Sequence, residues 1–261
     1  MTVLASARTL LFVPGNRPDR FAKAAASGAD AVVLDLEDAV APEQKPAARE
    51  HVAEWLKAGN SAVVRVNAAG TPWHDDDVAA VGDVAMALMV PKAERAEDLP
   101  RGTVIPLVET AAGIDNARAV CSAPGVVRPA FGSVDLAAEL GVDPASYYAL
   151  LHARSALVLA AAAAGCAPPV DGVTTSLDEV GLLRADTAHA VELGFTGKLC
   201  IHPRQIEHVH AALRPTDSEL DWARRVVAAA DGGVSVVDGQ MVDRPVVLRA
   251  ERLLSRGGTL R

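Results

Sequence analysis

The 261-residue chain contains only three cysteines, Cys121, Cys166 and Cys200. They stand far apart and form no Cys-x-x-Cys pair. Their odd number and their spacing favour neither a disulfide framework nor a zinc ribbon. So little cysteine is typical of a protein from a reducing compartment, where disulfides are rare.

Long apolar runs are also missing. The longest covers residues 156–167, which is well short of the roughly 20 residues that a helix needs to span a bilayer. The first residues lack the charged region, long apolar core and cleavage signal of an export peptide. We therefore expect a cytoplasmic protein without a membrane partner.

Positive charge is in deficit. The chain has 25 Lys and Arg against 33 Asp and Glu, which gives a formal net charge of −8. Surfaces that bind nucleic acids or anionic membranes need clustered Lys and Arg. The composition therefore argues against a nucleic-acid partner, and solubility is the simpler reason for the acidity.

No linker rich in Pro, Gly or Ser divides the chain, and 50% of its residues are hydrophobic, enough for one large core. Short β-branched runs alternate with Ala-rich amphipathic stretches, a pattern typical of parallel strands joined by helices. Candidate strands lie near 9–14, 31–36, 62–67, 87–91, 104–109, 128–132, 168–173 and 198–202. These eight units predict an α/β fold, a (β/α)8 TIM barrel over residues 1–230. Residues 231–261 form a C-terminal extension that we expect to pack on a barrel end or a neighbouring subunit.

Three charged side chains end or follow separate apolar runs: Arg65, Glu109 and Asp135. If those runs are parallel strands of one barrel, the three side chains converge on one rim. Carboxylates bind a hard divalent cation, and a guanidinium forks onto a substrate carboxylate. The pattern predicts an enzyme that holds a metal ion together with an α-keto or α-hydroxy acid.

Other interpretations of these strand ends stay open. Asp35, Glu37 and Asp38 could form a loop-facing acidic cluster at a strand end or a helix N-cap. Arg65 alone could be a structural ion pair. Lys92 stands where some barrel aldolases place a Schiff-base lysine. With carboxylates and an arginine at the neighbouring strand ends, we favour a metal enzyme and interpret Lys92 as an ion-pair or substrate-facing residue.

The loop Gly15-Asn16-Arg17 joins the first candidate strand to a helix. Amides at a helix N-terminus can receive phosphate groups, and Arg17, Arg20 and Lys23 lie close by in the sequence. The same loop could equally be a tight turn that carries solvated basic residues.

Several motifs follow one another along nearly the whole chain. They are LFVPGNRPDRFAKA at 11–24, DLEDAV at 35–40, RVN at 65–67, PK at 91–92, VET at 108–110, GKLCIHPRQ at 197–205 and QMVDRP at 240–245. Together they resemble the citrate lyase β-subunit (CitE-like) family of the HpcH/HpaI aldolase superfamily. That family includes malyl-CoA and citramalyl-CoA lyases.

The resemblance implies a (β/α)8 barrel that binds Mg2+ and cleaves a carbon–carbon bond in a 3-hydroxyacyl-CoA thioester. Citryl-, malyl-, citramalyl- and 3-hydroxy-3-methylglutaryl-CoA are candidate substrates, and the products are an acyl-CoA and a keto acid. By the same resemblance, Arg65 grips the keto-acid carboxylate, while Glu109 and Asp135 bind the metal. Glu37 and Asp38 are expected to hold water molecules around the metal or to orient Arg65.

The resemblance also extends to the two ends of the chain. Asp243 matches a late acidic residue that acts in proton transfer and is typically delivered by the adjacent subunit, so a homotrimer or a multiple of it is implied. Gly15 and Asn16 would help to bind coenzyme A, with Arg17 and Lys23 favoured over Arg20 as phosphate ligands.

One departure and two alternatives accompany the resemblance. The chain reads Gly132-Ser133-Val134-Asp135, whereas many relatives carry Glu before the metal-binding Asp. The first alternative is the β-subunit of a citrate lyase complex, acting on an acyl-carrier-protein thioester. The second is a non-catalytic barrel that binds a keto acid or coenzyme A.

Overall fold

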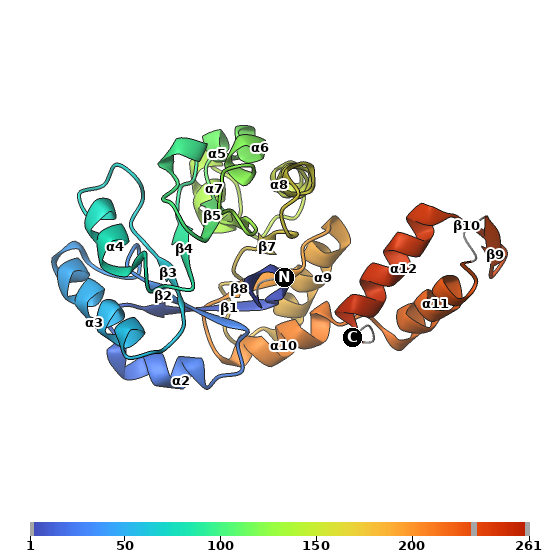
Figure 1. The fold of residues 1–261 in the computed structure, drawn as a ribbon, viewed down its shortest axis with the longest axis horizontal. Helices are drawn as coiled ribbons and strands as arrows, with labels where there is room; N and C mark the ends of the chain where they lie inside the picture. The colour runs from blue at the N-terminus through green and yellow to red at the C-terminus, as the bar shows by residue number, and fades with distance from the viewer. Residues whose placement is uncertain (1–2, 231–233, 259–261) are drawn as a thin grey trace. The chain divides into compact units, whose positions relative to one another are not determined.

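The computed structural model describes residues 3–230 and 234–258. Its centre is a closed barrel of eight parallel strands, with the last hydrogen-bonded to the first (Figure 1). The strands are β1 (Thr9–Pro14), β2 (Ala31–Asp35), β3 (Val63–Arg65), β4 (Ala87–Val90), β5 (Val104–Val108), β6 (Ala130–Phe131), β7 (Val170–Asp171) and β8 (Gly197–Cys200). The predicted (β/α)8 barrel is confirmed.

Helices connect successive strands on the outside of the barrel (Figure 1). They are α2 (Phe21–Ala25), α3 (Lys45–Lys57), α4 (His74–Val81), α5 (Ala111–Asp115), α6 (Ala117–Cys121), α7 (Ser133–Leu140), α8 (Leu151–Ala164) and α9 (Val180–Leu193). Helix α1 (Val3–Ser6) precedes the first strand, and α10 (Arg204–Leu213) follows the last. Short 3-10 turns are η1 (Pro18–Arg20), η2 (Pro42–Gln44) and η3 (Ala96–Asp98). The connection from β4 to β5 contains only η3 and no α-helix, in contrast to the other units.

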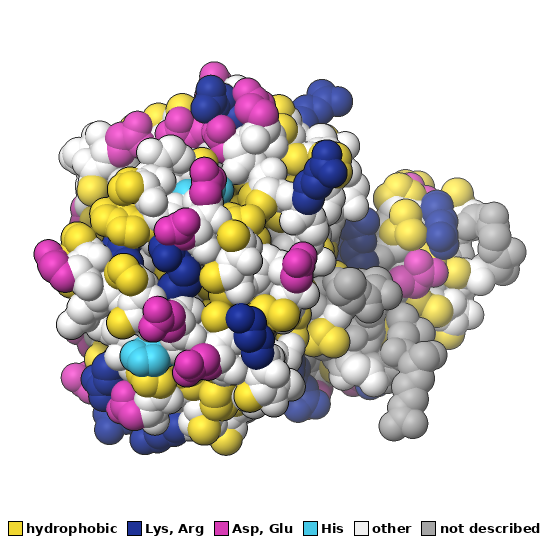
Figure 2. Space-filling view, turned by 60° about the vertical axis from the view of Figure 1, so that its left-hand side comes forward, with side chains coloured by type: hydrophobic (Ala, Val, Ile, Leu, Met, Phe, Trp, Pro, Cys, Tyr) yellow, Lys and Arg dark blue, Asp and Glu magenta, His cyan; other side chains and the backbone are white. Residues whose placement is uncertain are grey.

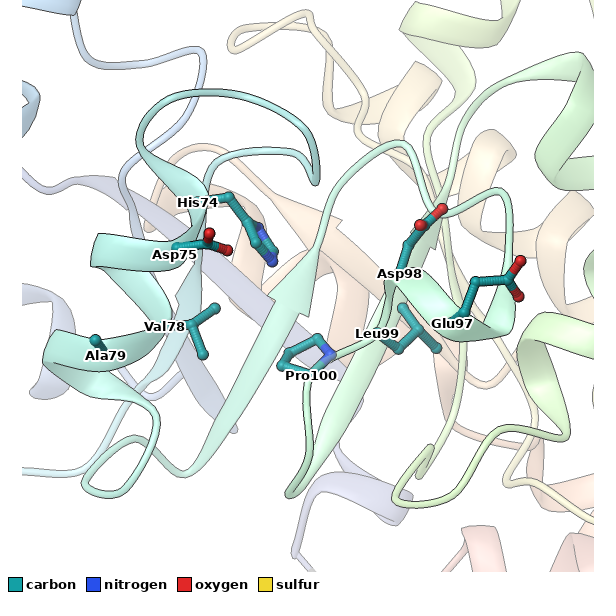
Figure 3. Close-up of a pocket in the computed structure, with 8 residues that line it drawn as sticks. All are labelled: His74, Asp75, Val78, Ala79, Glu97, Asp98, Leu99 and Pro100. Atoms are coloured by element: carbon teal, nitrogen blue, oxygen red, sulfur yellow. The ribbon is translucent and has the colours of Figure 1, made fainter.

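A groove of about 350 Å³ opens between α4 and the segment 97–100, beside the connection that lacks a helix. Figure 3 shows the imidazole of His74 turned towards this groove, with Leu99 and Pro100 on the other side. Nδ1 of His74 lies 2.7 Å from the backbone oxygen of Asn67, which fixes the ring. None of the residues that line the groove is a predicted site residue.

Apolar side chains fill the barrel because alternate strand residues point inward. The interior cluster includes Leu10, Val33, Met89 and Ile105, each of which is fully buried. Leu4 of α1 packs into the same cluster, so the N-terminal helix covers the end of the barrel at which the strands begin. No helix in the described part of the chain is long and apolar enough to cross a bilayer.

Arg128 is the largest fully buried side chain and precedes β6. Its guanidinium donates to the backbone oxygens of Ala7 at 2.7 Å and Pro168 at 2.8 Å and to Oγ1 of Thr196 at 2.7 Å. Burial lowers its pKa to about 10. These bonds link α1, β6 and the starts of β7 and β8 through one side chain.

Charges of both signs cover the outside of the barrel. Figure 2 shows acidic and basic side chains interspersed with small apolar areas over the face that it presents, without a continuous basic field. The picture agrees with the deficit of positive charge in the sequence.

The chain divides into two compact units at His210 and Ala211. The second unit contains α11 (Asp217–Ala228), the hairpin of β9 (Ser235–Val237) and β10 (Gln240–Val242), and α12 (Arg244–Arg256). It begins before residue 231, the boundary expected from the sequence, because Leu220 and Val226 of α11 pack against Leu254 of α12 in one core. Residues 231–233 and 259–261 of the expected extension lie outside the described residues.

Replacing Arg128 with Met should destabilise the barrel by roughly 2–5 kcal/mol, since several buried oxygens lose their only charged donor. Urea unfolding measures the change, with the exposed Arg118→Met as the matched control. Equal unfolding midpoints for the two variants would show that Arg128 does not hold the strand starts together.

Candidate functional site

Asp35 and Arg65 end neighbouring strands and are partners in the β2–β3 register, so both side chains reach the carboxyl end of the barrel. Nε and Nη2 of Arg65 donate to the two carboxylate oxygens of Asp35 at 2.7 and 2.6 Å. The Phe12 ring packs on the guanidinium, with Cζ 4.8 Å from the ring centre. One edge and one face of the guanidinium are thus fixed, which leaves Nη1 for other partners.

Glu37 lies between two cations and is buried. Its Oε1 accepts from Nζ of Lys92, while its Oε2 lies 3.0 Å from Nη1 of Arg65. That second contact lacks the alignment of a hydrogen bond, so Oε2 is a buried oxygen without a donor. Burial raises the pKa of Glu37, and the charges of Arg65 and Lys92 oppose the rise. Glu37 therefore has one oxygen that is free to accept a further ligand.

Lys92 follows β4 in a left-handed conformation, with φ of 50°. Its N–H donates to Oε1 of Glu109 at 2.9 Å. The N–H of the next residue, Ala93, donates to the backbone oxygen of Leu107 at 3.2 Å. L-residues seldom adopt this backbone conformation without a turn or a constraint. Here it directs the amide to one carboxylate and the side chain to another.

Glu109 follows β5 and is only 2% exposed. A side chain on Gly132 would overlap its carboxylate, so the absence of a Cβ there makes room for this group. Burial, followed by the charges of Asp135 and Glu37, raises the pKa of Glu109 to about 8. The charges of two other carboxyl groups therefore oppose the ionisation of Glu109.

Asp135 stands in the first turn of α7 and is half-buried. Val134, the residue before it, is 39% exposed. Asp38 is the outermost predicted acid: its side chain is 62% exposed, with Oδ2 3.8 Å from Nζ of Lys92.

The residues fit a magnesium ion. Mg2+ is usually bound through one or two carboxylates, with water and substrate oxygens as the remaining ligands. Glu109 and Asp135 supply such a pair, and a divalent cation would relieve the repulsion that raises the pKa of Glu109. Within residues 3–230 and 234–258, no three His, Cys, Asp or Glu side chains are arranged to enclose a metal alone. Two carboxylates leave the other positions of such an ion to water and substrate oxygens.

A buried polar network supports the loop after β2. Nζ of Lys45 donates to the backbone oxygens of Leu36 and Glu37 at 2.9 and 2.8 Å and to Oδ1 of Asn67 at 2.6 Å. Nδ2 of Asn67 donates to Asp77 at 2.6 Å. Sequence reasoning missed Lys45 and Asp77 as supports. Asn67 lies two residues beyond the end of β3, and its contacts with Leu36 and Asp77 come from the loop after that strand.

The predicted phosphate-binding loop lies beside β2. The N–H of Gly15 donates to the backbone oxygen of Asp35 at 2.7 Å, and a Cβ on Gly15 would meet the same oxygen at 2.8 Å. Asn16 donates to Gln44 at 2.5 Å, and its Oδ1 is buried without a partner. Arg17 pairs with Asp19 at 2.7 Å on the surface, and Lys23 is exposed on α2.

Asp243, the predicted proton-transfer residue, belongs to the second unit. Its Oδ1 accepts from the amide of Val246 at 3.3 Å, so the side chain caps α12. An asparagine could make the same cap, which separates the structural role of this side chain from its acidity.

Comparison with family descriptions gives two matches. Residues 8–101 and 100–203 match the HpcH/HpaI aldolase/citrate lyase family. Residues 158–259 match a family described as a C-C bond lyase of the TIM-barrel fold.

Comparison with individual proteins gives matches over nearly the full chain. A citrate lyase subunit beta-like protein of Mycobacterium tuberculosis is 42% identical, covering 99% of this chain and 98% of its own length. A (3S)-malyl-CoA thioesterase of Cereibacter sphaeroides is 33% identical, over 95% of this chain and 94% of its own. The crystal structure of CitE from M. tuberculosis with magnesium, acetoacetate and coenzyme A aligns with a TM-score of 0.86 at 39% identity, covering 97% of this chain and 99% of that chain.

Without a divalent cation, Glu109 should make stability fall as the pH rises. Its folded pKa of about 8 lies above its ordinary value of 4.5, so the folded state holds a proton that the unfolded chain releases in this window. The contribution of Glu109 to the free energy of unfolding is fully present below pH 4.5. It decreases between pH 4.5 and pH 8, by at most about 1.4 kcal/mol per pH unit. Urea unfolding in EDTA across this range measures the loss, which Glu109→Gln should abolish and the exposed Glu97→Gln should keep. Parallel profiles for wild type and Glu109→Gln would contradict the shift.

Proposed function

Because the chain belongs to the HpcH/HpaI aldolase/citrate lyase family, we propose that it is a Mg2+-dependent lyase that cleaves a carbon–carbon bond in a 3-hydroxyacyl-CoA thioester. The products are an acyl-CoA and a keto acid. The observation that carries the proposal is the Arg65 guanidinium, held by Asp35 at the same rim as the carboxyl groups of Glu37 and Glu109.

Arg65 binds the carboxylate of the fragment that leaves as the keto acid. Asp35 already holds Nε and Nη2, so the orientation of the guanidinium is set before the substrate arrives. Nη1 meets only the poorly aligned oxygen of Glu37, so its hydrogens remain available to a substrate carboxylate. Such preorganisation lowers the entropy lost on binding and positions the scissile bond.

Glu109 and Asp135 hold Mg2+, while Glu37 and Asp38 serve the surrounding water or orient Arg65. When bound, the ion supplies Lewis-acid stabilisation of the negative charge that develops on substrate oxygen. Glu109 must lose its proton as the ion binds, because a protonated carboxyl is a poor ligand for a hard cation. Support for Mg2+ comes from the M. tuberculosis CitE structures, which were determined with magnesium.

Cleavage breaks the bond between C2 and C3 of the thioester. The electron pair stays on C2 as the thioester enolate, the C3 hydroxyl passes its proton to solvent water and C3 becomes the keto carbonyl. The enolate carbon then takes up a proton, which we assign to Asp243. General acid catalysis of this kind contributes about 10²–10⁴ in rate.

The coenzyme A moiety would be held by Gly15, Asn16, Arg17 and Lys23. The loop lies against the backbone oxygen of Asp35, next to the substrate clamp, and the partnerless Oδ1 of Asn16 can accept a hydrogen bond. Arg17 would exchange its exposed contact with Asp19 for a phosphate.

We further propose a homotrimer, or a multiple of it, in which the C-terminal unit brings Asp243 to a neighbouring barrel. A cytoplasmic setting accords with the three free cysteines, Cys121, Cys166 and Cys200.

Hydrolysis is a second candidate reaction, favoured by the relatives described as (3S)-malyl-CoA thioesterases. Product analysis separates the two: cleavage gives an acyl-CoA and a keto acid, whereas hydrolysis gives free coenzyme A and a hydroxy acid. A carrier-protein thioester remains the alternative substrate, because another relative is a citrate lyase subunit beta from Leuconostoc mesenteroides.

With citryl-, malyl-, citramalyl- and 3-hydroxy-3-methylglutaryl-CoA as test substrates, wild type plus Mg2+ should release a keto acid from at least one. Arg65→Lys should still bind Mg2+ but lose more than about tenfold in kcat/KM, because an ammonium cannot make the two-bonded contact with Asp35 and at the same time present a fixed donor to the substrate carboxylate. Asp135→Asn should lose both activity and Mg2+ binding. Calorimetry and keto-acid assays check both, and wild-type kinetics in Arg65→Lys would make Arg65 structural. No turnover of any thioester, with Mg2+ bound, would leave the non-catalytic alternative.

Asp243→Asn should keep the α12 cap and lose activity. Glu109→Gln should also be inactive. Refolding the two inactive variants together should restore activity, because some mixed sites contain both intact residues. Mass spectrometry confirms mixed oligomers, and the keto-acid assay measures recovery. Demonstrated mixed oligomers with no recovered activity would show that Asp243 does not serve a neighbouring barrel. Full activity of Asp243→Asn alone would remove it from catalysis.

A further inference from the structure

Lys92 contacts two different parts of the site. Its amide donates to Glu109, a proposed metal ligand, and its ammonium donates to Glu37, which also faces the substrate clamp Arg65. The side chain is 39% exposed, so the ammonium stands at the mouth of the barrel. The left-handed backbone at Lys92 makes both contacts possible at once.

The two carboxylate oxygens of Glu37 thus face different cations. Oε1 is taken up by the ammonium of Lys92, and Oε2 stays 3.0 Å from Nη1 of Arg65 without hydrogen-bond alignment. If Glu37 were free to turn, Oε2 would form a full hydrogen bond with Nη1. A substrate carboxylate would then have to displace that bond, because both acceptors compete for the same hydrogens.

We propose that Lys92 is a positioning residue that holds Glu37 back from Arg65 and so keeps Nη1 available for the substrate carboxylate. This role rests on the proposed function, in which Arg65 binds the keto acid. It differs from a Schiff-base or ligand role, because Lys92 acts through Glu37.

The same ammonium opposes the metal ion. Its charge lies close to Glu37, Asp38 and Glu109, so it raises the local potential where a divalent cation would bind. Removing the charge should therefore move the two affinities in opposite directions: tighter Mg2+ and weaker keto acid. A general loss of structure would weaken both.

Lys92→Met is the principal variant, because methionine keeps an unbranched side chain and the same left-handed backbone demand while it removes the charge. Calorimetry of wild type and variant, with Mg2+ alone and then with pyruvate at saturating Mg2+, should show pyruvate affinity falling about tenfold. Mg2+ affinity should rise, by about threefold. Lys92→Arg should remain near wild type, and the exposed Lys57→Met should change neither affinity.

Combining Lys92→Met with Glu37→Gln in one protein shows whether Lys92 acts through Glu37. If Lys92 works through Glu37, Lys92→Met should add little further loss of pyruvate affinity in Glu37→Gln. An equal tenfold loss in both backgrounds would mean that Lys92 contacts the keto acid directly and would overturn the proposal. Parallel loss of Mg2+ and pyruvate affinity would overturn it as well. Lys92→Gln is measured alongside, so that misfolding of one variant does not decide the result.

A crystal structure of Lys92→Met tests the inference without any ligand. Oε2 of Glu37 should move into hydrogen-bond alignment with Nη1 of Arg65, and an unchanged Glu37 would contradict the proposal. Wild type that binds neither Mg2+ nor pyruvate would overturn the proposed function. Wild type that binds both, beside an unchanged Lys92→Met, would overturn the role of Lys92 alone.

Discussion

The pairing of Asp35 with Arg65 is the interaction on which the mouth of the barrel depends. Register places the two residues side by side on β2 and β3, and two hydrogen bonds of 2.6 and 2.7 Å fix the plane of the guanidinium. From that fixed plane follow the position of Nη1, the distance to Glu37 and the need for Lys92 as a second partner of Glu37. A single pair thus sets the geometry for several other charged groups.

The two ends of the barrel use buried charge in different ways. At the strand starts, Arg128 meets only neutral oxygens, all of which are satisfied, so it fastens elements together. At the strand ends, Glu37 retains an oxygen without a donor and Glu109 is kept from ionising by burial and by Asp135 and Glu37. The first end gains stability from its polar groups, whereas the second keeps unsatisfied groups ready for a ligand.

The sequence could predict the barrel and the nearness of Arg65 and Glu109, because strand ends in a parallel barrel share one rim. It could not choose a role for Asp35, since an acid after a strand also suits a helix cap. The burial of Lys45 depends on backbone oxygens of Leu36 and Glu37 that only the folded loop supplies. The sequence also did not show that the second unit begins before residue 231, because the apolar face of α11 does not indicate which helix it packs against. The positive φ of Lys92 has no signal in the residue itself.

Gly132 has an evolutionary consequence. Its backbone angles, φ −97° and ψ 86°, lie outside the left-handed region, so alanine is compatible with the local conformation. The added methyl group would nevertheless collide with the carboxylate of Glu109. Because the same methyl group would also meet Cβ of Glu109, which is fixed to the backbone, one substitution at this position would displace Glu109. Gly132 is accordingly a point at which a lineage of this fold could lose the buried carboxylate of its rim in a single mutational step.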